Sequence, residues 1–187
     1  NSSCEDTVNF INVDGHIREI SINNSFSDAL DVDFSRLKID TINIEYALND
    51  CVDFSAGSYE LGDLNLNDCG DKALSVGEKS FIELNQIIAN NANIGIASKD
   101  SSIVKANKAS LNNLETCVAA YKKKQEFIGA LIKVKEKKCT NFYKKADIDI
   151  FSKIYDGNKN LQNFTYGDRY EQSELQLQKV NGKPVIK

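Results

Sequence analysis

The chain has 187 residues, of which 41% are hydrophobic and 27% are charged, and its formal net charge is −4. This length fits one domain with a continuous core, and no run of about 18 apolar residues is present, so membrane insertion is not expected. The acidic balance and the lack of a glycine-rich phosphate-binding loop argue against nucleic acid as a partner.

A short phrase recurs every 22 residues through the first two thirds of the chain. Its copies read TVNFI, ALDVD, CVDFS, ALSVG, GIASK and CVAAY, and they begin at residues 7, 29, 51, 73, 95 and 117. The first position is small from the second copy onward, and the second position is always aliphatic. The aliphatic residues are Val8, Leu30, Val52, Leu74, Ile96 and Val118.

A second apolar string follows in each copy, for example Ile17, Ile20 and Ile22. It slips by one residue in the copies that contain Leu84 and Ala106. A polar residue comes directly after each string, and stacked Asn side chains at such a corner can hydrogen-bond along a ladder. These polar residues are Asn23, Glu45, Asn67, Asn90 and Asn112.

A fixed period near 20 residues without helical periodicity predicts a solenoid of short strands. The leucine-rich consensus LxxLxLxxN never occurs intact, so we predict an all-β fold, a parallel β-helix of about six coils. The crossover rule predicts a right-handed coil. Leu30, Val52, Leu74, Ile96 and Val118 should then stack inward.

The period breaks after Tyr121. The segment KKKQEF adds a charged loop, and IGALIKV and ADIDIFSKIY are expected to form closing strands of irregular coils. The last segment, LQLQKVNGKPVIK, is predicted to form a hairpin around Asn181-Gly182. We therefore assign residues 1–155 to the β-helix and residues 156–187 to a C-terminal cap or hairpin tail that protects the last coil.

Aspartates come into register on the first coils. Asp28 and Asp50 are one period apart, as are Asp31 and Asp53, so each pair should stack about 4.8 Å apart. Alternation turns Asp31 and Asp33 outward. Like charges this close repel unless a cation, a proton or a substrate lies between them.

Three interpretations of these aspartates stay open at this point. They form a solvated acidic face, or Asp28, Asp31, Asp33, Asp50 and Asp53 bind calcium through their carboxylate oxygens. In the third interpretation, Asp31 and Asp53 are the acid and base of a polysaccharide lyase, hydrolase or epimerase. Lys72 would then supply the cation that neutralises a uronate.

The charged loop is the second candidate site. Loops that project from a solenoid often form its binding surface, and lysine beside an aromatic residue suits a sugar or an anionic polymer. A solvated loop is the alternative. The candidate binding residues are Tyr121, Lys122, Lys123, Lys124 and Glu126.

The five cysteines form no CxxC pair, and the chain contains one histidine, so a zinc site is not expected. Cys51 and Cys117 occupy the small-residue position of the repeat, which is explained by core packing. The odd number of cysteines excludes a framework in which all are paired.

The segments DALDVDFS, GDKALSVGEKS, NIGIASKDSSIV and CVAAYKKKQEFIGA resemble the right-handed parallel β-helix segment of bacterial CotH-type (spore-coat-kinase-like) surface proteins. The resemblance covers about Asp28 to Ala130. Ala29, Cys51 and Ala73 replace the family's glycine, and EFI replaces EFG. The matching positions are Asp28, Asp31, Asp50, Asp53, Asp71, Lys72, Glu78, Lys99, Asp100, Tyr121, Lys123, Lys124, Glu126 and Phe127.

The resemblance implies a β-helix in an extracellular or cell-envelope setting and assigns no catalytic residue. The chain starts at Asn1 and contains no methionine, so we expect a piece of a longer polypeptide with other domains. We predict a module of a bacterial surface protein that binds carbohydrate or serves as a scaffold, without catalysis of its own. A polysaccharide is the expected partner, and no cofactor other than calcium is expected.

Charge is divided unevenly along the chain. Residues 1–98 contain 17 acidic and 5 basic side chains, for a net charge of −12, and residues 99–187 contain 10 and 18, for +8; the sum is −4. In an elongated solenoid this division predicts an acidic end and a basic end.

Overall fold

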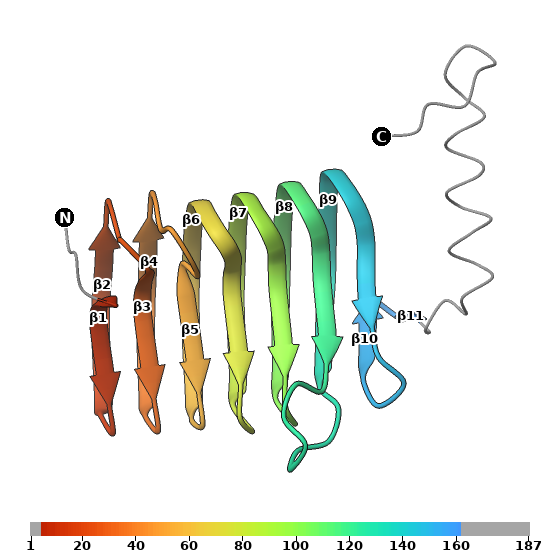
Figure 1. The fold of residues 1–187 in the computed structure, drawn as a ribbon, viewed down its shortest axis with the longest axis horizontal. Coiled ribbons are helices and arrows are strands. Elements are labelled where there is room, and N and C mark those ends of the chain that lie inside the picture. Colours follow the sequence, from red (N-terminus) through yellow and green to blue (C-terminus); the bar gives the residue numbers. More distant parts are fainter. Residues whose placement is uncertain (1–4, 162–187) are drawn as a thin grey trace.

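The computed structural model describes residues 5–161, and all regular elements in this range are β-strands. Figure 1 shows the coils lined up in chain order along the long axis of the molecule. The strands are β1 (Asp6–Ile11), β2 (Asp14–Ile22), β3 (Asp28–Asp33), β4 (Arg36–Ile44), β5 (Val52–Ser55), β6 (Ser58–Gly77), β7 (Phe81–Lys99), β8 (Ile103–Tyr121), β9 (Leu131–Ile148), β10 (Lys153–Asp156) and β11 (Lys159–Leu161).

The strands pair in parallel, one coil on the next, and form a β-solenoid of about 7 turns. The predicted fold class is confirmed, with one turn more than the expected six. The predicted closing segments form β9 and β10, and β10 pairs antiparallel with β11. The predicted hairpin at Asn181-Gly182 lies outside the described residues, and so does most of the predicted cap.

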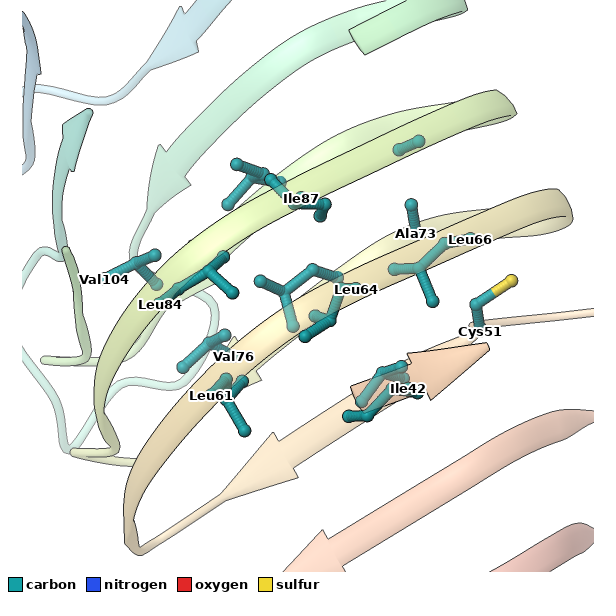
Figure 2. Close-up of a cluster of buried hydrophobic side chains, with 14 of the residues drawn as sticks. Ile42, Cys51, Leu61, Leu64, Leu66, Ala73, Val76, Leu84, Ile87 and Val104 are labelled. Carbon is teal, nitrogen blue, oxygen red and sulfur yellow. The ribbon is translucent and has the colours of Figure 1, made fainter. Parts of the chain in front are cut away.

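The aliphatic position of the repeat forms the centre of the core. Leu30, Val52, Leu74, Ile96 and Val118 are successive register partners, and each is fully buried, as predicted. The second apolar string lines the other side of the interior, where Leu61, Leu64 and Leu66 project toward Val76 and Ala73 in Figure 2.

The expected one-residue slip is also present. Leu61 pairs with Leu84 at a spacing of 23 residues, and the register returns to 22 between Cys69 and Lys72, where the β6–β7 ladder shifts. The chain absorbs the extra residue in this irregularity, because a one-residue slip carried further would turn the buried side chains of β7 outward. The core is therefore continuous across the slip.

Residues in the left-handed conformation lie at two corners of the coil, and at the second corner only from Asp68 onward. The first file contains Asn12, Phe34, Ala56, Glu78 and Asp100, which have positive φ and recur every 22 residues. The other corner is occupied by asparagine and aspartate, which tolerate the left-handed conformation well. The second file contains Asp68, Asn91, Asn113 and Asn141.

The predicted polar ladder lies one residue before this second file. The Asn90 amide donates to Oδ1 of Asn67 at 2.9 Å, and Thr140 Oγ1 donates to Oδ1 of Asn112 at 2.9 Å. At these two steps the corner polar groups of neighbouring coils therefore satisfy one another along the axis.

Candidate functional site

The acidic patch consists of Asp28, Asp31, Asp33, Asp50 and Asp53 on β3, β5 and the turn before β5. Asp31 and Asp53 are register partners, which places them one above the other on neighbouring coils. Leu30 and Val32 are fully buried between these acids, so the predicted alternation is correct. The stack of register-paired aspartates ends at Ser75, the register partner of Asp53 on the next coil.

The carboxylates of Asp28 and Asp50 accept hydrogen bonds from backbone N–H groups rather than facing solvent. Oδ1 of Asp28 accepts hydrogen bonds from the backbone N–H of Asp50 at 2.9 Å and from the Asn49 amide at 2.7 Å. Oδ1 of Asp50 accepts the backbone N–H of Lys72 at 2.9 Å. Each carboxylate therefore connects its own coil to the next one along the axis.

Two lysines meet the patch at different places. Nζ of Lys72 lies 3.3 Å from Asp50 and also contacts Asp71. Lys99 is buried, donates to Oγ of Ser75 at 2.7 Å, and lies 3.8 Å from Oδ2 of Asp53. Lys99 is therefore the cation that faces the Asp31–Asp53 pair. The sequence analysis gave Lys99 no role at this pair.

Burial and neighbouring charge act together on Asp31. Desolvation, followed by the charges of Asp33, Asp6 and Asp53, raises the pKa of Asp31 to about 7. Desolvation also raises the pKa of Asp50 to about 6, although Lys72 opposes the shift. Near neutral pH, Asp31 can therefore carry or release a proton.

The raised pKa of Asp31 makes stability depend on pH. Between pH 4 and 7 the folded state holds a proton on Asp31 that the unfolded state has released, so the free energy of unfolding falls as pH rises through this window. We expect Asp31→Asn to raise that free energy by about 1–2 kcal/mol at pH 8, a value reduced for partial exposure, and to have little effect at pH 4.

Melting temperatures measured from pH 4 to 8 test this expectation. Asn at position 31 can still accept the hydrogen bond that Asn9 donates to Oδ2 of Asp31 at 3.0 Å. Asp147→Asn on β9 is the matched control, because residue 147 is exposed. Parallel pH curves for the Asp31 variant and the unmodified protein would contradict the expectation.

Calcium binding at the acidic patch stays a prediction. Within residues 5–161, no three acidic, histidine or cysteine side chains lie close enough together to hold a metal ion jointly. Two of the five carboxylates are also engaged by backbone N–H groups. A larger rise in melting temperature with Ca²⁺ than with Na⁺ at matched ionic strength is the outcome that would support calcium.

The charged loop spans residues 122–130 between β8 and β9 and projects from one edge of the solenoid (Figure 1). Asp100, itself buried, fixes its start: Oδ1 of Asp100 accepts the backbone N–H groups of Lys123 at 2.7 Å and Lys124 at 2.8 Å. Oδ2 of Asp149 accepts the N–H of Lys122 at 2.6 Å. The loop therefore has defined anchors.

The five predicted loop residues differ in exposure. The Tyr121 ring is half-buried on β8, and desolvation raises the pKa of its hydroxyl. Lys124 contacts Glu78 at the adjoining corner. Lys123, Lys124 and Glu126 are exposed, and Lys122 is partly exposed. The structure brings these residues to the edge at the end of β8, where the charges of Lys72, Asp71 and Asp50 act on the Tyr121 hydroxyl.

A groove that the sequence did not reveal runs along the axis on other strands. Its volume is about 910 Å³, and its walls come from β4, β6, β7, β8, β9, β10 and the turn after β10. One file of outward residues, each the register partner of the next, follows it across six coils. This file is Lys38, Glu60, Glu83, Lys105, Lys133 and Tyr155.

A second file makes the floor of the groove. In each pair of neighbouring strands, the residues before and after this second file are register partners, but the residues of the file itself are not paired. The backbone is therefore irregular along the file. Gly62 shows how close the coils come here, because a Cβ atom on it would lie 2.1 Å from the backbone oxygen of Asp40. The file is Asp40, Gly62, Asn85, Asn107 and Lys135.

Four cysteines form two disulfides, Cys51–Cys69 and Cys117–Cys139. The prediction that packing alone explains Cys51 and Cys117 is therefore wrong, although both are fully buried. A separation of 18 or 22 residues is close to one period, which brings the two ends of a coil together. The period alone does not identify the pairs, because the two cysteines of each pair occupy different positions of the repeat.

Comparison with protein-family models, with curated proteins and with solved structures finds no match. The resemblance to CotH-type surface proteins therefore depends on the quoted motifs, while the β-solenoid itself is observed. Between residues 5 and 161 there is also no helix long and apolar enough to span a membrane.

Proposed function

We propose that this chain is a polysaccharide-binding β-solenoid of a bacterial surface protein, and that the axial groove is its binding site. The observation that carries the proposal is the file of outward side chains that follows the groove through six coils. At the spacing of paired strands, six coils extend about 24 Å, which suits several units of a linear polymer. A repeating ladder offers similar contacts to each unit.

Tyr155 gives the groove an aromatic platform. It lies at the C-terminal end of the file, and Nζ of Lys133 is 5.4 Å from the centre of its ring. A tyrosine ring with a polar hydroxyl presents an apolar face to a sugar and a hydrogen-bonding group at its edge. In the same way, Nζ of Lys105 lies over the Phe81 ring, 4.6 Å from its centre.

We expect Tyr155→Ala to weaken binding of a linear polysaccharide about tenfold, or about 1.4 kcal/mol, because a sugar ring loses its stacking partner. Affinity electrophoresis against a panel of neutral and acidic polysaccharides measures this. The matched control is Tyr143→Ala, since Tyr143 is 72% exposed and outside the groove. If the unmodified protein binds no polysaccharide, only the scaffold role is left.

An extracytoplasmic location has support from the disulfides. Two disulfides in one small domain are typical of proteins from oxidising compartments. The resemblance to CotH-type surface proteins points to the same setting. A longer parent polypeptide would then display the solenoid as one of its modules.

A second candidate function is polysaccharide cleavage at the acidic patch. One observation favours it: Asp31, with a pKa of about 7, stacks on Asp53, and Lys99 lies 3.8 Å from Asp53. The aspartates lie on β3 and β5, whereas the groove is built on β4 and the strands that continue it. Cleavage of a uronan that is lost in Asp31→Asn would support this function, and absence of cleavage would remove it.

A further inference from the structure

The groove is divided by charge along its length. Its walls in the N-terminal part contribute Asp40, Glu60, Asp63 and Glu83 against Lys38. The C-terminal part, on β8 and β9, contributes Lys105, Lys133 and Lys135 without an acidic residue. The polarity seen in the whole sequence is therefore repeated inside one groove.

Three carboxylates of the acidic part have partners among their own neighbours. Nε2 of His16 lies 2.8 Å from Asp40, Nζ of Lys105 lies 3.3 Å from Glu83, and the Asn85 amide donates to Asp63 at 2.9 Å. In contrast, no carboxylate of residues 5–161 lies within 4.0 Å of the ammonium of Lys133 or Lys135. In the described residues, the lysines of the groove left without a carboxylate partner in its C-terminal part are therefore Lys133 and Lys135.

The three lysines are held near one another by the fold. Lys105 and Lys133 are register partners on β8 and β9, so their backbones are about 4.8 Å apart. Lys133 and Lys135 alternate with the buried Val134, so both face the groove from the same strand. Like charges paired directly across strands destabilise a sheet unless an anion lies between them.

The next coil places an aromatic ring beside this cluster. Tyr155 on β10 is the register partner of Lys133, at the blue end of the solenoid in Figure 1. A sugar ring stacked on Tyr155 would place its acidic substituent within reach of Lys133 and Lys135. Lysine ammonium groups bind such a group as point charges, whether it is a carboxylate or a sulfate.

We propose that the C-terminal part of the groove, formed by Lys105, Lys133, Lys135 and Tyr155, selects acidic polysaccharides. This inference depends on the proposed function, since it names the substrate class of the same groove. The Tyr155 ring carries affinity for any sugar, and the lysines add the preference for an anionic unit. Preference from exposed charges should fall with ionic strength.

The test compares a charge-reversed groove with a matched control on the full chain. Lys133→Glu/Lys135→Glu reverses two charges inside the groove. Lys108→Glu/Lys138→Glu reverses two exposed lysines on β8 and β9 outside it. Binding is measured to a neutral glucan, a polyuronate, a sulfated glycan and poly-L-glutamate at 50 and 300 mM NaCl.

We expect the unmodified protein and the control to bind the acidic glycans about tenfold more tightly than the neutral glucan at low salt. The groove variant should lose that preference and keep its binding to the glucan. The polyuronate and sulfated arms show which anionic group is preferred. Because poly-L-glutamate carries carboxylates without rings that could stack on Tyr155, its binding should be weak in all three proteins.

Several outcomes would overturn the inference. Equal binding of neutral and acidic glycans would refute the selection by lysine and leave the proposed function intact. Equal losses in the groove and control variants, or poly-L-glutamate bound as tightly as polyuronate, would show unspecific charge attraction. Binding to no glycan at all would instead refute the proposed function itself.

Discussion

Replacing Cys51 and Cys69 together by alanine should lower the free energy of unfolding by about 3 kcal/mol, because the disulfide no longer restricts the unfolded chain. The bond closes a loop with a sequence separation of 18 residues. Alanine suits both positions: Ala47 and Ala92 are the register partners of Cys69, and Ala29 and Ala73 occupy the position of Cys51 on neighbouring coils. The loss therefore reports the cross-link rather than a packing defect.

Urea denaturation with and without a reducing agent measures this loss. The reductant should destabilise the unmodified protein at both disulfides and the double variant only at Cys117–Cys139. The corresponding fall in melting temperature for the variant is about 6–12 °C for a domain of this size. A variant that unfolds at the same urea concentration as the unmodified protein would contradict the expectation.

The sequence predicted the solenoid because its period is imposed by stacking. Each coil buries its apolar face only against the next coil, so the aliphatic residue must return at the same position. Leu30, Val52 and Leu74 show this directly, since they are both the repeated letters and consecutive register partners in the core. The one-residue register slip at Leu84 was also predictable, because the apolar residues of a string keep their spacing from one another when the register changes.

Contacts between different positions of the repeat could not be predicted in the same way. The link between Cys51 and Cys69 joins two different columns of the alignment. The period aligns residues of one column and gives no information on which columns face one another across a corner. The shape of the cross-section determines that, and it is absent from a one-dimensional pattern.

The groove was missed for a related reason. Its outward file combines Lys38, Glu60, Glu83, Lys105 and Tyr155, which share no side-chain chemistry, so the alignment showed no column there. The ladders also skip a residue at Asp40 and Gly62, so the backbone is irregular where this variable surface lines the groove. A groove that selects one polymer would use side chains that differ from coil to coil. The stacked aspartates, in contrast, repeat with the period and therefore form a visible column in the alignment.

Lys72→Met should destabilise the folded chain by about 3 kcal/mol or more at pH 7.5, because it leaves a buried carboxylate without its cation. The side chain of Asp50 is only 5% exposed and that of Lys72 13%, and Nζ of Lys72 lies 3.3 Å from Oδ1 of Asp50. The backbone N–H of residue 72 still donates to Asp50 in the variant, so the loss isolates the ammonium group. An exposed pair gives the comparison: Arg36→Met, which removes the partner of Asp14, should cost less than about 1 kcal/mol.

The pH dependence of the Lys72→Met variant follows from the same pair. Lys72 lowers the pKa of Asp50, which burial raises to about 6, so removing Lys72 must move that pKa further upward. The variant then protonates Asp50 on folding at neutral pH, and its free energy of unfolding should recover as the pH is lowered toward 5. Adding Asp50→Asn should restore most of the stability at pH 7.5, since no buried charge is left. A double-mutant cycle in urea at pH 5 and 7.5 measures the coupling, and a coupling near zero at pH 7.5 would show that solvent screens this pair.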